Sequence, residues 1–407
     1  MKLNLKKYIG PGPLIAAAFI GPGTVTVCTI AGVNFGYDLL WAILLSILVT
    51  IVFQEMSSRI GLATQSGLAN LLNQTIQNKI ARFLAIGLVI MAIFLGNAAY
   101  EAGNIGGGAL GAALLLDLPT LDFGDFSLNL YSLFIGVVAL LLLLLGSYES
   151  IQKFLIALVI LMSITFLTAA IMTRPSLAEL FRGLTPTVHP TNIITIVALL
   201  GTTVVPYNLF LHSALVAQKW KTRADLKWVR LDTMLSVGLG GLVSAAIVVT
   251  AAGGSAIGVE SAADLALGLE PTFGVLAKYL IALGLLAAGI TSAMTAPLAG
   301  ALVLTGCFGL SQDIRTKPMR LSMGFIVLLG LIFASLGIRP VQLITFAQLT
   351  NGILLPLIAA YILVVINQKK LLKNLVNSPW QNLWGIACWL LTLILGAGSL
   401  LKVIGIW

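Results

Sequence analysis

Two long hydrophobic segments of this chain are each interrupted by proline and by residues that favour an unwound backbone. The first break, residues 19–24, reads Phe-Ile-Gly-Pro-Gly-Thr, and the second, residues 204–208, reads Val-Val-Pro-Tyr-Asn. Proline removes a backbone donor and clashes with the preceding turn, and glycine adds conformational freedom. Unwound backbone at membrane depth is tolerated only where it is buried in protein or lines a cavity. The two breaks therefore predict where the chemistry of this chain lies.

The composition is that of a polytopic membrane protein. Of the 407 residues, 59% are hydrophobic and only 9% are charged, whereas soluble domains carry about 25% charged residues. The net charge of +9 does not indicate a nucleic-acid partner, because basic cytoplasmic loops give membrane proteins such a charge. The three cysteines, Cys28, Cys307 and Cys388, are dispersed in apolar runs and predict neither a disulfide framework nor a zinc site.

Stretches of about 20 apolar residues predict membrane-spanning helices. This chain contains eleven of them, at residues 12–34, 38–58, 81–114, 129–146, 151–173, 192–219, 231–253, 273–306, 321–338, 341–366 and 383–405. The predicted fold class is therefore an all-α polytopic membrane protein with about eleven transmembrane helices, whose partner is the lipid bilayer.

The basic residues predict the orientation of these spans. With the N-terminus in the cytoplasm, most of the 23 Lys and Arg residues fall on the cytoplasmic side. The exceptions are Arg174, Arg182, Lys278, Arg339 and Lys402. This positive-inside asymmetry predicts a C-terminus on the outside. The compact chain without long tails favours a bacterial inner membrane.

Eleven spans divide into five, five and one. Two similar halves with an odd number of spans must sit in opposite senses in the membrane, so we expect one transmembrane domain over residues 1–407 with inverted repeats at 1–173 and 192–366 and an extra helix at 383–405. Each break falls in the first span of its half, as in secondary transporters whose substrate binds at discontinuous helices. No GxxxxGK[ST] motif is present, so neither an ATP-driven pump nor an enzyme is predicted, and no cofactor is expected.

Several motifs spread over the chain carry a resemblance to a known family. They are Gly-Pro-Gly-Pro-Leu at 10–14, Gly-Pro-Gly at 21–23, Phe-Gln-Glu-Met-Ser-Ser-Arg-Ile-Gly-Leu-Ala-Thr at 53–64, Pro-Tyr-Asn-Leu-Phe-Leu-His-Ser-Ala-Leu-Val at 206–216, Ala-Pro-Leu-Ala-Gly at 296–300 and Gln-Leu-Thr-Asn-Gly-Ile-Leu-Leu-Pro at 348–356. Together these motifs resemble the Nramp family of proton-coupled divalent metal transporters. The resemblance runs through essentially the whole chain and implies a LeuT-type fold with broken helices 1 and 6.

The departures from this family lie at its metal site. The family's first-span motif is Asp-Pro-Gly-Asn, whose Asp and Asn bind the metal, but residues 21–24 here read Gly-Pro-Gly-Thr. The sixth-span motif Met-Pro-His reads Val205-Pro206-Tyr207. Of two family acids in the third span, the first aligns with Ala98 and only Glu101 remains. The resemblance implies a divalent cation substrate, of magnesium or manganese type, and the departures predict weak binding with altered selectivity.

The groups left at the breaks are neutral. Ala18 and Thr202 match positions where the family uses backbone oxygens, and nearby hydroxyls and amides add further neutral ligands. The predicted substrate site comprises Ala18, Gly21, Pro22, Gly23, Thr24, Thr202, Val205, Tyr207, Asn208, Gln348 and Asn351. Such a set can hold a hydrated cation weakly, since a divalent cation usually binds a compensating carboxylate or softer side-chain ligands.

The first break can also be interpreted as a site for an anion instead of a cation. A Gly-Pro-Gly break exposes backbone N–H groups where a half-helix begins, near Thr24, and helix N-termini attract anions. A transporter of a small neutral amino acid or carboxylate is therefore an alternative that needs no metal. A third possibility is a membrane sensor that kept the scaffold without transport, although retained breaks and a retained Glu101 argue against it.

Two ionisable side chains within the spans are candidates for moving a coupling proton. Glu101 lies in a long apolar span, where an acid is costly and marks a functional site by default. The alternative for Glu101 is a hydrogen-bonded tie between spans. The resemblance implies a proton-path role for His212, although a single His on a helix is more often a packing residue. Glu55 and Arg59, four residues apart at a predicted cytoplasmic helix end, predict a structural ion pair or gate latch.

Overall fold

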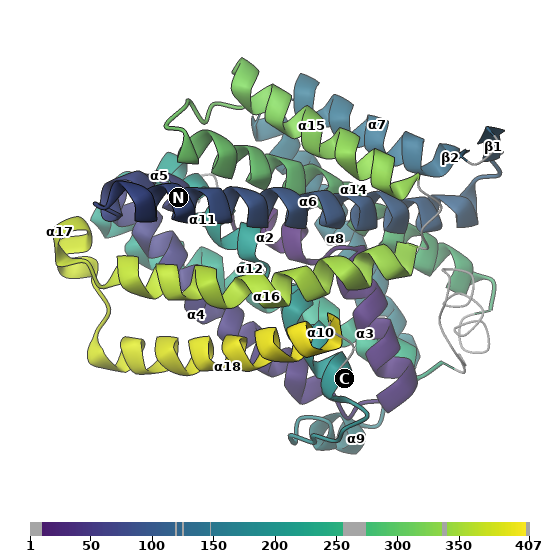
Figure 1. Ribbon diagram of the computed structural model, residues 1–407. Coiled ribbons are helices and arrows are strands. Elements are labelled where there is room, and N and C mark those ends of the chain that lie inside the picture. Colours follow the sequence, from purple (N-terminus) through teal and green to yellow (C-terminus); the bar gives the residue numbers. More distant parts are fainter. Residues whose placement is uncertain are drawn as a thin grey trace, which may run out of the picture.

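The computed structural model describes residues 10–118, 120–123, 126–146, 148–254, 274–335 and 340–403. Long helices dominate this part of the chain and form one bundle, in which α6, α16 and α18 run side by side (Figure 1). The described start of the chain, α5 and α17 lie at one end of this bundle, and the β1–β2 hairpin lies at the other.

The described elements follow the chain in this order. They are α2 (Gly12–Phe19), α3 (Pro22–Phe35), α4 (Leu40–Thr64), α5 (Leu68–Thr75), α6 (Lys79–Leu115), β1 (Thr120–Phe123), β2 (Phe126–Asn129), α7 (Leu130–Leu145), α8 (Tyr148–Met172), α9 (Leu177–Arg182), α10 (Ile193–Thr203), α11 (Pro206–Lys219), the 3₁₀ turn Arg223–Asp225, α12 (Leu226–Ala252), α14 (Leu276–Cys307), α15 (Lys317–Ala334), α16 (Pro340–Ile366), α17 (Lys369–Leu372), the 3₁₀ turn Lys373–Leu375 and α18 (Pro379–Val403).

The predicted all-α membrane fold is confirmed. Each of the eleven predicted intervals contains one long helix or one broken pair of helices. Within the described residues, 8 helices are by themselves long and apolar enough to cross a membrane, or up to 10 spans if each bent pair counts once. The helix α7 is apolar but only 16 residues long, which is short for a straight span.

The connections contain structure that the sequence analysis did not predict. The helices α5, α9 and α17 and the antiparallel β1–β2 pair, with Thr120 opposite Asn129, all lie between spans. A search for about 20 consecutive apolar residues cannot find elements of four to eight residues. The helix α4 also continues to Thr64, six residues beyond the predicted end at 58.

Both predicted breaks are present. At the first, Ile20 and Gly21 leave helical geometry (ψ of 68° and −178°), and α2 and α3 are bent by 56°. At the second, Val204 and Val205 separate α10 from α11. The second half-helices begin at Pro22 and Pro206, so the start expected near Thr24 lies two residues too late. Proline suits this position because its missing N–H has no partner in the first turn and its φ is already helical.

The long helix α6 supports the first break through glycine contacts. A Cβ atom at Gly107 would lie 2.1 Å from the Cβ of Pro22, and one at Gly289 of α14 would lie 2.3 Å from the Cα of Gly108. Small residues let helix backbones approach closely. Such packing matters in lipid, because no hydrophobic effect drives helices together there. Gly107 and Gly108 thus permit close contact between α6 and its neighbours at the first break.

Replacing Gly107 by Ala should therefore destabilise the protein. The added methyl overlaps Pro22, and overpacking typically costs about 1–3 kcal/mol of unfolding free energy. The matched control is Gly87→Ala on the same helix, where a Cβ meets nothing within 4 Å. We expect thermal unfolding in detergent to show a lower Tm for Gly107→Ala and no loss for Gly87→Ala. Equal melting temperatures would show that α6 does not hold the break.

Candidate functional site

The two breaks lie against one another in the middle of the bundle. The hydroxyl oxygens of Thr24 and Thr202 are 2.7 Å apart, and the Tyr207 hydroxyl donates a hydrogen bond of 2.9 Å to the carbonyl of Ala18. Thr24, Thr202 and Tyr207 are all buried. The structure thus brings together four residues of the predicted substrate site, from both broken spans.

Hydroxyl groups satisfy the last three carbonyls of α2. Thr24 donates to the carbonyl of Phe19, Tyr207 donates to that of Ala18, and Ser292 of α14 donates to that of Ala17 over 3.4 Å. The final carbonyls of a helix have no partner within the helix and carry partial negative charge. A side-chain proton therefore already occupies the carbonyl of Ala18, one of the two backbone oxygens expected to bind a cation.

The space beside Gly21 is filled by side chains from other helices. A Cβ at Gly21 would lie 2.5 Å from the hydroxyl oxygen of Ser292 and 3.5 Å from the amide oxygen of Asn104 on α6. The sequence analysis missed both residues. A signal was available for each: Ser292 is a polar residue in the apolar stretch of α14, and Asn104 lies three residues after Glu101, on the same side of its helix.

The remaining predicted site residues differ in what surrounds them. Pro22 and Gly23 form the buried first turn of α3, and Val205 is buried at the start of α11. Asn208 is fully buried, and neither of its amide atoms has a hydrogen-bond partner in the described part of the chain. The backbone of α16 carries Gln348 and Asn351, but their side chains lie outside what the structure describes.

The described residues contain no metal cluster of the usual kind. Among the described residues, no three side chains of His, Cys, Asp or Glu come together in a group that could hold a metal ion. The polar groups around the breaks are hydroxyls, amides and backbone carbonyls instead. These are neutral oxygen donors, which suit hard cations better than soft ones.

Glu101 lies on α6 close to the second break. The neighbouring Tyr100 packs edge-on against Tyr207, with ring centroids 5.7 Å apart. Glu101 is fully buried, and both carboxyl oxygens lack a hydrogen-bond partner among the described residues. Its stem rests on Gly330 of α15, where a Cβ would lie 2.3 Å from the Cγ of Glu101. A buried acid without a polar partner is costly to keep.

His212 faces α4 from one turn beyond Asn208. Its Nδ1 atom is 2.7 Å from the side-chain oxygen of Gln54, and its Nε2 atom has no hydrogen-bond partner in the described structure. The ring is fully buried. His212 is therefore half-satisfied, which separates it from a packing residue whose polar atoms are all paired.

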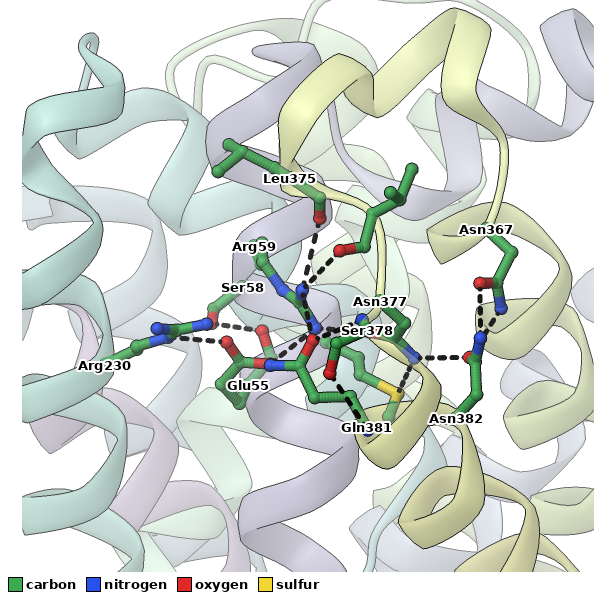
Figure 2. Close-up of polar contacts among 12 residues, drawn as sticks. Glu55, Ser58, Arg59, Arg230, Asn367, Leu375, Asn377, Ser378, Gln381 and Asn382 are labelled. Atoms are coloured by element: carbon green, nitrogen blue, oxygen red, sulfur yellow. Dashed lines mark hydrogen bonds and ion pairs between the residues drawn. The ribbon is translucent and has the colours of Figure 1, made fainter.

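The predicted ion pair of Glu55 and Arg59 is present and belongs to a larger cluster (Figure 2). Arg230 of α12 binds the same carboxylate, with Nε 2.8 Å from the second oxygen of Glu55. Arg59 is buried and also donates to the side chain of Asn377 at 2.5 Å and to backbone carbonyls just before it. The pair lies inside α4 and not at its end, and it ties α4 to α12 and to the segment before α18.

A second carboxylate at this end of the bundle holds the beginning of α2. Asp232 of α12 accepts hydrogen bonds from the backbone N–H groups of Gly10, at 3.0 Å, and Gly12, at 2.7 Å. Gln152 of α8 donates to the carbonyl of Gly10 at 3.0 Å. The Trp220 ring covers Gly10, since a Cβ there would lie 1.9 Å from it. The half-helix α2 is therefore fixed at one end by Asp232 and at the other by the three hydroxyls.

Comparison with known proteins shows which class this architecture defines. The fold matches solved structures of the Eremococcus coleocola manganese transporter; one of them, a mutant form, gives a TM-score of 0.82 and 20% identity over 98% of this chain and 88% of that one. It also matches MhsT in complex with L-phenylalanine, with a TM-score of 0.61 and 16% identity over 96% and 98% of the two chains. The chain is thus a membrane protein of the LeuT-type fold, with broken helices in the first and sixth spans.

The family follows from sequence. The model of the family described as "Natural resistance-associated macrophage protein-like" matches residues 12–402, so the chain belongs to the Nramp family. The divalent metal cation transporter MntH of Brucella suis is 28% identical over 92% of this chain and 83% of its own length. MntH of Xanthomonas campestris is 30% identical over 74% of this chain and 69% of its own length. These relatives are transporters and not enzymes.

Changing Asp232 to Asn should loosen the start of α2. The amide keeps one acceptor but turns a donor toward a backbone N–H, and an unmatched buried group costs about 1–3 kcal/mol. We expect faster hydrogen exchange in residues 12–19 and a lower Tm. Asp313→Asn is the control, because Asp313 lies in an exposed loop. Unchanged exchange in α2 would show that Asp232 does not hold this half-helix.

Proposed function

We propose that this protein moves a divalent metal cation across the membrane by alternating access, with weak affinity and a selectivity that differs from that of its relatives. Family membership and the metal-transporter relatives support the substrate class. The observation that carries the proposal is the meeting of the two breaks at Thr24 and Thr202, where the hydroxyl oxygens are 2.7 Å apart. Substrate sites of transporters with this fold lie where such discontinuous helices meet.

The neutral surroundings support weak binding of a hard ion. Magnesium is reluctant to lose water and often keeps several water ligands, which hydroxyls and amides can bind through hydrogen bonds. Manganese in a dry site needs direct ligands, and the α2 carbonyls nearest the break already accept hydrogen bonds from Thr24, Tyr207 and Ser292. A magnesium-like selectivity is consistent with both facts.

Glu101 and His212 are the residues that we assign to coupling by protons. Each is fully buried and retains a polar atom without a partner among the described residues. Glu101 lies beside Tyr100, whose ring contacts Tyr207 at the second break. A buried carboxyl can take up a proton and lose it only when water or substrate reaches it, which links its charge to the conformational cycle.

The membrane arrangement completes the proposal. We further propose that the N-terminus, Arg59 and Arg230 lie on the cytoplasmic side and the C-terminus outside, because basic residues favour the cytoplasmic side, and that the membrane is a bacterial inner membrane. The cluster around Glu55 then lies near the cytoplasm, as do the hydrogen bonds of Asp232 to Gly10 and Gly12. These contacts join α2, α4 and α12 and support a conformation closed on that side. Residues 1–173 and 192–366 serve as the two inverted repeats, with 383–405 outside them.

A second candidate substrate is a small neutral amino acid or carboxylate. The observation in its favour is that the residues from Ala18 to Thr24 and from Thr202 to Asn208 include no acidic side chain. Such a site does not repel a carboxylate, and the first turn of α3 offers backbone N–H groups to it.

Uptake by one preparation of proteoliposomes tests the two candidates together. We expect saturable entry of labelled Mg²⁺ or Mn²⁺ above the level of empty liposomes, with a half-saturating concentration higher than that of an MntH relative reconstituted in parallel. A panel of labelled amino acids should show no saturable entry. Amino-acid uptake without cation uptake would contradict the metal proposal and support the second candidate.

Glu101→Gln should uncouple transport from protons. The amide resembles the protonated carboxyl in shape and polarity, so folding should persist, but it cannot release a proton. We expect substrate-driven acidification of the liposome lumen to disappear, as measured with a trapped pH dye. Glu179→Gln on the short helix α9, outside the spans, is the control. Unchanged proton flux in Glu101→Gln would contradict the assignment.

A further inference from the structure

Gly21 has no side chain, but the space beside it at the first break is not empty. The hydroxyl oxygen of Ser292 lies 2.5 Å, and its Cβ lies 3.2 Å, from where a Cβ of residue 21 would be. The amide oxygen of Asn104 lies 3.5 Å from the same point. Two residues from α14 and α6 therefore occupy the neighbourhood of residue 21. Both are buried.

The same serine also acts on the backbone of the break. Its hydroxyl donates to the carbonyl of Ala17, one of the three α2 carbonyls that accept side-chain hydrogen bonds. This bond is 3.4 Å long, whereas the Tyr207 bond to Ala18 is 2.9 Å. Of the three hydrogen bonds to α2 carbonyls, the one from Ser292 is therefore the weakest, and a cation displaces it most easily.

We propose that Ser292 and Asn104 determine the specificity of the break site. They keep residue 21 small, and they hold a bound divalent cation at a distance that leaves its water shell in place. This inference rests on the proposed function and names residues of the same site. A hydroxyl and an amide at this place can hydrogen-bond to the waters of a hydrated cation. Ser292 also crowds any residue-21 side chain that would bind the ion directly, while Asn104 lies at contact distance from it.

The packing around residue 21 predicts what happens when a carboxylate is added there. In Gly21→Asp, the new Cβ forces the Ser292 hydroxyl to rotate and give up the carbonyl of Ala17. The Ser292 Cβ at 3.2 Å still crowds the new atom, so rotation alone does not relieve the contact. Ser292→Gly removes both atoms. The two substitutions should therefore be coupled, because Ser292→Gly removes the two atoms that crowd the side chain added by Gly21→Asp.

Manganese is the probe for the test, and calorimetry on the purified full chain is the measurement. We expect Gly21→Asp alone to gain little affinity for Mn²⁺ and Ser292→Gly alone to gain none. The double variant should bind about tenfold more tightly than Gly21→Asp, within the range by which residues beside a metal site alter affinity. Gly21→Asp with Ser244→Gly is the matched control, since Ser244 is an equally buried serine on α12. Equal affinity of Gly21→Asp with and without Ser292→Gly would overturn the proposal.

A second measurement does not depend on the carboxylate variants folding well. Gly21→Ala should lower the Tm because its methyl meets Ser292, and Ser292→Gly should restore part of that loss. Absence of rescue would overturn the packing argument. Failure of the proposed function gives a different result, because it would appear as absent cation uptake by the unaltered protein. The coupling between residues 21 and 292 is measured independently of that uptake.

Discussion

The absence of water from the membrane interior is the constraint on which this structure depends. Every backbone carbonyl freed by a broken helix must find a partner within the protein. At the end of α2 the partners are the hydroxyls of Thr24, Tyr207 and Ser292, which come from α3, α11 and α14. These hydrogen bonds join α2 to α3, α11 and α14 at the break, so the chemistry that makes the break tolerable also assembles the proposed site.

The half-helix α2 is held at both ends by groups of different strength. Asp232 is an acceptor for two backbone N–H groups at its start, while neutral hydroxyls bind the carbonyls at its end. Hydrogen bonds to charged groups are stronger than those between neutral groups. We therefore expect a bound substrate to displace the hydrogen bonds at the break more readily than those of Asp232. Release of the Asp232 hydrogen bonds then requires movement of other helices.

Much of this arrangement could be predicted from sequence, and the failures have a physical reason. The spans and both breaks follow from hydrophobic length and from proline, which are local properties. Thr24 and Tyr207 were predicted because they lie in the breaks and Thr202 because of the family resemblance, and the structure places the three together. The polarity of Ser292 and Asn104 within apolar helices was visible in the sequence, but their place beside Gly21 depends on how α14 and α6 pack, which no local pattern contains. The assignment of substrate and proton roles to individual residues stays a prediction.

The contact of Glu101 with Gly330 has a consequence for how sequences of this kind can vary. The Cγ of Glu101 occupies the volume that any side chain at position 330 would need. The Cβ of Glu101 at 2.8 Å and its backbone carbon at 3.1 Å crowd the same point, so a shorter side chain at 101 would not make room for a larger residue at 330. Among relatives that pack α6 and α15 in the same way, position 330 should therefore stay glycine whichever side chain stands at 101.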